Sequence, residues 1–266
     1  SQVDPMSDGT GGVARREALI DSVRAVEPNV ILIDAGDAVQ GSLFFTLFHG
    51  EVEQKLMNAL GYDIQILGNH EFDNGLQSLK RQLAAATPVL LATNYDFSAT
   101  PLNGMLRPYT VREIDGKRLG FFAVNINPDG LIDHSCYDGM RYLDAYDAAD
   151  AMAWYLRNIE KCDKVIAVTH IGYDDINGIN DAGLASRSKN IDIIIGGHSH
   201  TLIDPAAPEA RIANAEGDTV LVLQTRNKGA YLGEIDIDLS SGHTDARLLK
   251  VDGRLDNRLD PAVDSL

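Results

Sequence analysis

The segment 68–73, Gly-Asn-His-Glu-Phe-Asp, constrains this chain more than any other stretch of it. It follows the apolar run 64–67, which predicts a buried strand, and it precedes a helical pattern that starts near Gly75. An amide, an imidazole and a carboxylate therefore lie in a tight turn at the carboxyl end of a strand. Ligands of open α/β sheets bind at that edge, so the segment predicts a functional site on an α/β fold.

Composition restricts the possible partners of the chain. Its 266 residues are enough for one large domain, and the formal net charge of −16 argues against a nucleic-acid polymer or an anionic membrane surface as partner. A phosphorylated small molecule stays possible, because bound divalent cations reverse the sign of the charge locally. No apolar run reaches 18 residues, so no membrane span is predicted, and no signal peptide is visible.

Cys136 and Cys162 are too far apart for a Cys-x-x-Cys motif and are expected to be two idle thiols.

Hydrophobic periodicity predicts a mixture of helices and strands. Helices are expected over 12–27, 51–60, 77–86, 145–159 and 182–189. Strands are expected over 30–33, 64–67, 89–92, 164–168, 191–195, 220–224, 233–239 and 246–251, and a hairpin over 109–124 with a type I′ turn at Asp115-Gly116. Strand and helix alternate in the first part, whereas the last part is mostly strand. This order predicts one α/β domain over 1–266 with mixed sheets.

Polar side chains gather where the predicted strands end. Four of the seven histidines follow such strands directly, and an aspartate and an asparagine occupy equivalent turns: His70, His170, His198, His200, Asp37 and Asn69. One histidine of this kind would be an ordinary strand-end residue, but four at one edge of a sheet indicate a metal site. Mixed nitrogen and oxygen donors suit Zn²⁺, Mn²⁺ or iron and not Ca²⁺. An aspartate that bridges two such ions about 3.5–4 Å apart is a common arrangement for phosphoester hydrolysis.

Four motifs, taken in order, resemble those of the calcineurin-like metallophosphoesterases: Gly36-Asp37-x-x-x-Gly41, Gly68-Asn69-His70-Glu71, Thr169-His170 and Gly197-His198-Ser199-His200. The segment 68–73, together with 11–15 (Gly-Gly-Val-Ala-Arg), is similar specifically to the 5′-nucleotidase branch of that family. The resemblance covers nearly the whole chain. It implies a four-layer α/β/β/α sandwich with mixed sheets.

The resemblance also implies two divalent metal ions, drawn from Zn, Mn and Fe, or with Mg in place of one. In the family pattern Asp37 bridges both ions. Asn69, His170 and His198 complete the second metal site, and His200 belongs to the first. The nucleophile implied is a water activated by the two metals.

The catalytic pair implied by the resemblance is His70 with Asp73. His70 stabilises the phosphoryl transition state, Asp73 orients the ring of His70, and Asn69 and His70 contact the substrate phosphate. A cationic imidazole would offset charge that develops on the phosphate oxygens. Glu71 is expected to be a solvated or supporting carboxylate, and Phe72 a packing residue.

Four further polar residues are interpreted more plainly. Asp34 is expected to support the loop of Asp37. His49 and His243 are expected to be exposed, and His134 to be an ordinary loop histidine.

The sequence departs from the family pattern at both ends. The family opens with a strand that carries Asp-x-His, which supplies ligands to the first metal, but residues 1–10 contain Asp4 and Asp8 and no histidine. We therefore expect an incomplete first site, so that this chain binds one ion well and the other poorly. Long 5′-nucleotidases also carry a separate C-terminal nucleotide-binding domain, which we expect this chain to lack. Nucleoside selectivity is then expected to be loose, or to be supplied by a separate substrate-binding subunit.

The resemblance implies a phosphoric ester hydrolase that acts on a phosphorylated small molecule, a nucleotide first of all, and so a role in nucleotide catabolism. Two alternatives stay open: a catalytically impaired remnant that binds metal or ligand, and a phosphodiesterase or cyclic-nucleotide hydrolase of the same superfamily. A periplasmic or cell-surface location is expected by analogy with the family alone.

Overall fold

The computed structural model describes residues 3–174 and 178–260. The helices are α1 (Val13–Arg24), α2 (Leu43–Phe48), α3 (Glu51–Ala59), α4 (Gly75–Leu83), α5 (Ala145–Asn158) and α6 (Asp181–Arg187). The strands are β1 (Ile33–Asp34), β2 (Ile64–Ile66), β3 (Val89–Leu91), β4 (Tyr95–Asp96), β5 (Tyr109–Ile114), β6 (Lys117–Asn125), β7 (Arg141–Tyr142), β8 (Lys164–His170), β9 (Ile193–Ile195), β10 (Arg211–Ala213), β11 (Thr219–Leu223), β12 (Tyr231–Ile237) and β13 (Thr244–Lys250).

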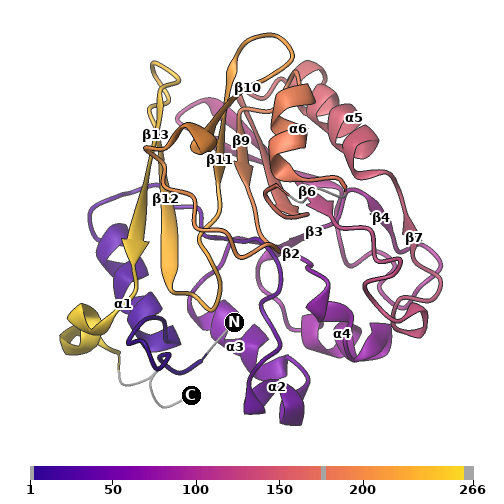
Figure 1. Cartoon of the computed structure of the whole chain (residues 1–266), viewed down its shortest axis with the longest axis vertical. Coiled ribbons are helices and arrows are strands. Elements are labelled where there is room, and N and C mark those ends of the chain that lie inside the picture. Colours follow the sequence, from indigo (N-terminus) through magenta and orange to yellow (C-terminus); the bar gives the residue numbers. More distant parts are fainter. Residues whose placement is uncertain (1–2, 175–177, 261–266) are drawn as a thin grey trace.

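Two sheets form the centre of the molecule (Figure 1). The smaller is parallel, with the order β1-β2-β3, and the larger has the order β10-β11-β9-β8-β6-β5. The larger sheet is mixed: β6, β8, β9 and β11 run parallel, while β5 and β10 are antiparallel to their neighbours. One hydrophobic cluster contains buried residues of both sheets, such as Ile64 of the smaller and Phe122 of the larger. The two sheets therefore pack against each other.

Helices cover the outer faces of both sheets. On the larger sheet α5 packs against β6 and β8, and α6 packs against β10 and β11. On the other side α3 and α4 lie together, and Gln54 of α3 donates a hydrogen bond to Gln65 of β2 at 3.1 Å. Figure 1 shows α5 and α6 at one end of the molecule and α3 and α4 at the other. The expected α/β/β/α order with mixed sheets is confirmed.

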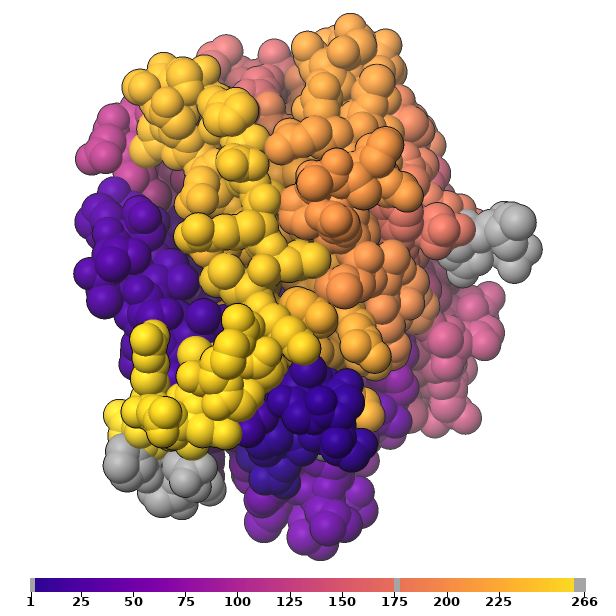
Figure 2. Space-filling view, turned by 60° about the vertical axis from the view of Figure 1, so that its left-hand side comes forward, coloured from indigo at the N-terminus to yellow at the C-terminus, as the bar shows by residue number. Residues whose placement is uncertain are grey.

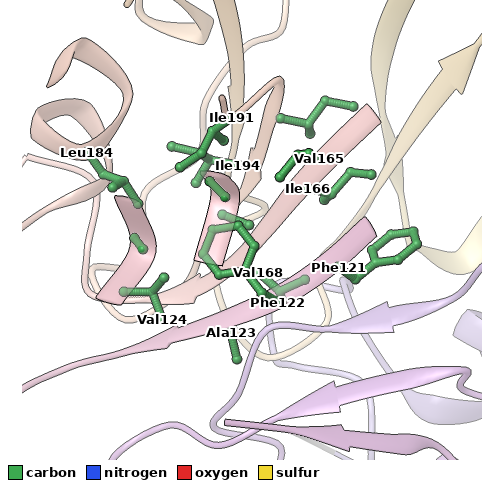
Figure 3. Packing of buried hydrophobic residues seen from close by; sticks show 14 of the residues in the cluster. Phe121, Phe122, Ala123, Val124, Val165, Ile166, Val168, Leu184, Ile191 and Ile194 are labelled. Atoms are coloured by element: carbon green, nitrogen blue, oxygen red, sulfur yellow. The ribbon is translucent and has the colours of Figure 1, made fainter. Parts of the chain in front are cut away.

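The core is densest along β6 and β8, whose side chains lie next to one another in Figure 3. Phe122, Ala123 and Val168 have no exposed surface, or almost none. Both strands are flanked by other strands and covered on both faces, so they are buried at nearly every position and their central residues are apolar without alternation. That is why their sequence reads as continuous hydrophobic runs.

A pair of buried asparagines joins the two sheets at their carboxyl ends. Asn125, the last residue of β6, donates through Nδ2 to the carbonyl of Leu67, which follows β2. Asn94, just past β3, exchanges bonds of 2.8 Å with the backbone N–H and carbonyl of Asn125. The turns that follow β2, β3 and β6 are thereby held at one edge of the sandwich.

The two ends of the described chain lie side by side. Figure 2 shows the C-terminal segment packed against the N-terminal one. Thr10 and Asp252 form an antiparallel bridge, and the Arg15 guanidinium pairs with the carboxylate of Asp256. The 3₁₀ helix Gly253–Arg258, which follows β13, therefore packs against α1.

The structure corrects several of the expected elements. The strand expected over 30–33 is wrong in its bounds, because β1 covers only Ile33–Asp34. The N–H of Leu32 donates to the side chain of Asp63 at 2.9 Å, not to a backbone carbonyl, so the ladder begins one residue later. The helix α2, the short pair β4–β7 and the strand β10 were not expected at all. The hairpin over 109–124 is confirmed, with positive φ at both Asp115 and Gly116 as a type I′ turn requires.

Truncation of a core aromatic ring tests this packing. Phe122→Ala should lower the free energy of unfolding by about 3–5 kcal/mol, because the side chain is fully buried and leaves a cavity. Urea denaturation followed by circular dichroism measures the loss. The matched control is Phe48→Ala on α2, where the ring is 48% exposed and the expected change is below about 1 kcal/mol. Equal losses in the two variants would contradict the assigned core.

Candidate metal centre

Three side chains from three separate turns or strand ends converge at the carboxyl edge of the sandwich. Asp37 follows β1, His170 ends β8 and His198 follows β9. Each offers one potential ligand atom, and these atoms all lie within 4.8 Å of one another. The imidazole rings of His170 and His198 are 5.3 Å apart between centroids. A carboxylate and two imidazoles at this spacing fit a single transition-metal ion.

The orientation of His170 supports this interpretation. Its Nδ1 lies 2.7 Å from the carbonyl oxygen of Ala35, and since a carbonyl only accepts, Nδ1 carries the proton. The other nitrogen, Nε2, lies 3.0 Å from Oδ2 of Asp37 yet makes no well-directed hydrogen bond among the described residues. In the neutral ring a lone pair then faces a carboxylate oxygen, an arrangement that a cation between them would satisfy. Histidines that bind metals characteristically donate their second nitrogen to a backbone carbonyl in this way.

Asn69 and His198 form the opposite side of the cluster. Oδ1 of Asn69 lies 2.9 Å from Nδ1 of His198, and Asn69 is 7% exposed. This contact places Asn69 directly beside the cluster. The structure thus brings together the four residues that were expected at the second metal site, Asp37, Asn69, His170 and His198.

The backbone is strained at three of the expected ligands. Asp37, His198 and His200 have φ values of 56°, 80° and 58°, in the left-handed region that non-glycine residues rarely adopt. Such strain persists only where the surroundings enforce it, and it concentrates at functional sites. Gly68 shows how tight the turns are, because a Cβ there would lie 2.2 Å from Oδ1 of Asp37.

Asp37 lies at the electrostatic centre of the cluster. Burial acts to raise its pKa, but the imidazole of His170 and the N–H and ring of His70 outweigh burial and hold the pKa well below its usual range. Burial acts to lower the pKa of His170, and the Asp37 carboxylate outweighs it, so that this pKa is raised. The Asp37 carboxylate is therefore anionic at neutral pH.

The expected catalytic pair is in contact. Nδ1 of His70 lies 3.0 Å from Oδ2 of Asp73, and both side chains are about a third exposed. The N–H of His70 donates to Oδ1 of Asp37 at 2.9 Å, which ties the pair to the cluster. A cleft of about 290 Å³ is lined by two residues of the cluster, the pair, two apolar residues, and Asn69 and His200: Asp37, Asn69, His70, Asp73, Leu131, Ile132, His198 and His200.

His200 stands apart from the convergent group. It lines the same cleft, but its nitrogens do not belong to the set of ligand atoms formed by Asp37, His170 and His198. Its Nδ1 lies 3.3 Å from Nδ2 of Asn227. Burial, together with the nearby cationic groups, lowers the pKa of His200 against the opposing carboxylate of Asp37. The assignment of His200 to a first metal site stays a prediction, as do the roles of the other site residues.

Glu71 is buried, so of the two expected roles, a solvated or a supporting carboxylate, the structure agrees with the supporting one. It is 3% exposed, and its two carboxylate oxygens accept the backbone N–H groups of Asp37, Ala38 and Gly68 at 3.0, 2.8 and 2.6 Å. Burial and the carboxylates of Asp37 and Asp34 raise its pKa to about 7. The sequence indicates this role only weakly. Glu71 follows Gly68 by three residues, a spacing at which a carboxylate can accept a backbone N–H of its own turn.

Asp181 is a second buried carboxylate that the sequence did not single out. It has no exposed surface, and it accepts a 2.6 Å bond from the hydroxyl of Thr169, next to His170. A Cβ on Gly196 would lie 2.1 Å from its Oδ2, so it also packs against the turn that carries His198. Burial raises the pKa of Asp181 to about 7, against the bond from Thr169.

The remaining predicted polar residues lie where they were expected. His49, His134 and His243 are exposed, and His134 lies in a short 3₁₀ helix, His134–Cys136. Oδ1 of Asp34 accepts the N–H of Gly36 at 3.0 Å and so supports the turn of Asp37. Phe72 is fully buried among other aromatic rings. Cys136 and Cys162 are both free thiols.

Residues 6–202 match the protein family described as calcineurin-like phosphoesterase. Among curated proteins, the chain is 32% identical over 256 residues to the trifunctional nucleotide phosphoesterase protein YfkN of Bacillus subtilis, and the match covers 84% of this chain and 17% of that protein. It is 30% identical over 242 residues to human 5′-nucleotidase, covering 86% of this chain and 41% of that protein. The chain thus spans less than half the length of these relatives.

Solved structures agree in fold. The 5′-nucleotidase precursor of Thermus thermophilus superposes with a TM-score of 0.80 at 32% identity, over 92% of this chain and 50% of that one. The Bacillus subtilis YfkN structure gives a TM-score of 0.75 at 24% identity and covers 95% of this chain and 88% of that one. Over the ranges 3–174 and 178–260, no helix has the length and apolarity that crossing a membrane requires.

Removal of one imidazole tests the metal cluster. His170→Ala should weaken Mn²⁺ binding by about 10-fold to 1,000-fold, because it deletes a buried nitrogen from a group of three potential ligands. Isothermal titration calorimetry measures the affinity. The control is His49→Ala, since His49 is exposed and outside the cleft. Identical Mn²⁺ affinities in the two variants would show that the cluster does not bind the ion.

The raised pKa of Asp181 predicts that the free energy of unfolding depends on pH. Its pKa is about 7 in the folded chain and 3.8 in the unfolded one, so between these values the folded state holds a proton that the unfolded state has released. The contribution of Asp181 to stability is therefore largest at low pH and falls as the pH rises through this window, by at most about 1.4 kcal/mol per pH unit. Asp181→Asn should remove this contribution, so that stability falls less steeply between about pH 4 and pH 7 than in the unmodified chain, measured by urea denaturation in EDTA. Parallel profiles for the two proteins would contradict the assignment.

Proposed function

This chain belongs to the calcineurin-like phosphoesterase family, and we propose that it is a metal-dependent phosphohydrolase that removes phosphate from nucleotide monoesters, as a 5′-nucleotidase does. The observation that carries the proposal is the joint placement of two groups in one cleft. The Asp37–His170–His198 cluster holds potential metal ligands, and the His70–Asp73 pair lies beside it. A phosphate that enters this cleft meets both groups.

In this proposal one group of residues would bind the metal ion and a second would bind the phosphate. Asp37, Asn69, His170 and His198 would hold a divalent ion, which supplies Lewis-acid stabilisation to phosphate and lowers the pKa of water when bound. Asp73 accepts from Nδ1 of His70 and so fixes the ring, which leaves Nε2 for the phosphate. A hydrogen bond from Nε2–H to a phosphate oxygen would strengthen as negative charge develops there in the transition state.

The cleft also favours an ester with an organic leaving group. Two consecutive apolar residues, Leu131 and Ile132, line it beside the polar cluster, and Leu131 is 46% exposed. Their backbone N–H groups both bond to the carbonyl of Pro128, so the wall is ordered. A nucleoside presents an apolar face of the kind that this wall would contact. The curated relatives named as nucleotide phosphoesterase and 5′-nucleotidase support the same substrate class.

Two further parts of the proposal concern occupancy and location. Three potential ligands, Asp37, His170 and His198, lie together with Asn69 beside His198, whereas a first site would draw on Asp37 and His200. We therefore propose tight binding of one ion and weaker binding of a second. A periplasmic or cell-surface location is proposed by family analogy.

Phosphate release measures the proposed activity. With Mn²⁺, the chain should release inorganic phosphate from adenosine 5′-monophosphate, and chelation by EDTA should abolish the release. The diester bis(4-nitrophenyl) phosphate, assayed in parallel, separates monoesterase from diesterase activity. Hydrolysis of the diester alone would replace the proposed function by the diesterase alternative. Absence of both activities in a chain that binds Mn²⁺ stoichiometrically would leave the ligand-binding alternative.

A variant at His70 separates catalysis from metal binding. His70→Asn should lower kcat by about 10² to 10⁴, since it removes the group that faces the phosphate. Its Mn²⁺ affinity should stay that of the unmodified chain, because the His70 side chain is outside the convergent ligand set. His243→Asn, at an exposed position, is the matched control and should keep full activity. A His70→Asn variant that loses its metal would show that His70 is a ligand.

A further inference from the structure

The turns after β1 and β2 are joined by two carboxylates that each bond to the other turn. Asp37, on the first turn, accepts the N–H of His70 on the second at 2.9 Å. Glu71, on the second turn, accepts the N–H groups of Asp37 and Ala38 on the first at 3.0 and 2.8 Å. It also accepts the N–H of Gly68 in its own turn at 2.6 Å. The exchange is reciprocal, so neither turn can shift without breaking bonds to the other.

Glu71 acts on the backbone that aims the expected bridging ligand. Asp37 has a φ of 56°, a conformation that an aspartate keeps only when its surroundings enforce it. The bonds from Glu71 hold the N–H of Asp37 itself and of the next residue. They therefore fix the direction in which the Asp37 side chain leaves the turn, toward Nε2 of His170 at 3.0 Å.

Glu71 is not placed to be a metal ligand. Both of its oxygens already accept backbone N–H groups, and the residue is 3% exposed. The cleft that holds the metal cluster is lined by its neighbour His70 and not by Glu71. Its contribution must then pass through the residues that it holds.

We propose that Glu71 is a positioning residue for metal binding, which preorganises the Asp37 carboxylate by joining the Asp37 turn to the His70 turn. The inference rests on the metal cluster of the proposed function. Residues that orient metal ligands in this way typically change metal affinity by about 10-fold to 100-fold when they are replaced. Because the same exchange of bonds holds His70, Glu71 also links the metal cluster to the catalytic pair.

The variant Glu71→Gln tests the proposal, since it keeps the size of the side chain and directs an amide N–H at backbone donors. The metal-free variant should still fold, and its affinity for Co²⁺ should fall by about 10-fold to 100-fold. The visible absorption of bound Co²⁺ should change as well, because it reports the geometry of the ligands. Glu53→Gln is the matched control: Glu53 is also 3% exposed, but its bonded partner is the hydroxyl of Ser42 and it contacts neither N–H group of the Asp37 turn.

The outcomes are distinct. A lower melting temperature in both variants with unchanged Co²⁺ affinity and spectrum would overturn the proposal and leave Glu71 a purely structural residue. Absence of Co²⁺ binding in the unmodified chain would instead overturn the metal cluster of the proposed function.

A measurement on the unmodified chain covers the case in which Glu71→Gln does not fold. Amide hydrogen exchange in EDTA should show the N–H groups of Asp37, Ala38 and Gly68 already protected before any metal is added, because Glu71 holds them. Rapid exchange of these amides in the folded metal-free chain would overturn the proposal.

Discussion

The bond from His170 to the carbonyl of Ala35 decides what the carboxyl edge of this sandwich can do. It joins the end of β8 in the larger sheet to the turn after β1 in the smaller one. By fixing the proton on Nδ1, it leaves Nε2 to face Asp37, and by crossing between the sheets it makes the cluster depend on how the two sheets pack. The bonds of Asn125 to Leu67 and Asn94 hold the same edge from the next strands along. The site is therefore a property of the interface between the sheets and not of a single loop.

The layered fold could be predicted from the sequence because the patterns that indicate it lie within short segments of the chain. Continuous apolar runs identify β6 and β8, and a polar residue follows each run where the strand ends. The histidines at strand ends could therefore be assigned to one edge of a sheet from the sequence alone. The elements that were missed have weak local signals. The pair β4–β7 joins residues about 45 positions apart in two-residue strands, and α2 has no buried residue, so neither leaves a periodic pattern.

The supporting residues of the site were harder to foresee for a different reason. Glu71, Asn94 and Asp181 act through buried bonds to distant backbone or to one hydroxyl, and a single sequence does not show which carboxylate or amide will be buried. For Glu71 the sequence left a solvated and a supporting role open, because charged residues are almost never fully buried unless they are paired. Its partners are three backbone N–H groups, which become available only once the two turns meet. The candidate metal ligands were easier to predict, since they could be recognised from their residue types and their places at strand ends, without knowledge of their burial.

The central claim is that Asp37, Asn69, His170 and His198 bind one divalent ion at the edge where the two sheets meet. Anomalous diffraction from a crystal soaked in Mn²⁺ tests it most directly, because the signal locates the ion without reference to activity. The account predicts a strong peak within coordinating distance of Nε2 of His170 and the Asp37 carboxylate, and at most a weaker second peak toward His200. A crystal with no peak beside Nε2 of His170, or with its main peak elsewhere on the chain, would contradict it.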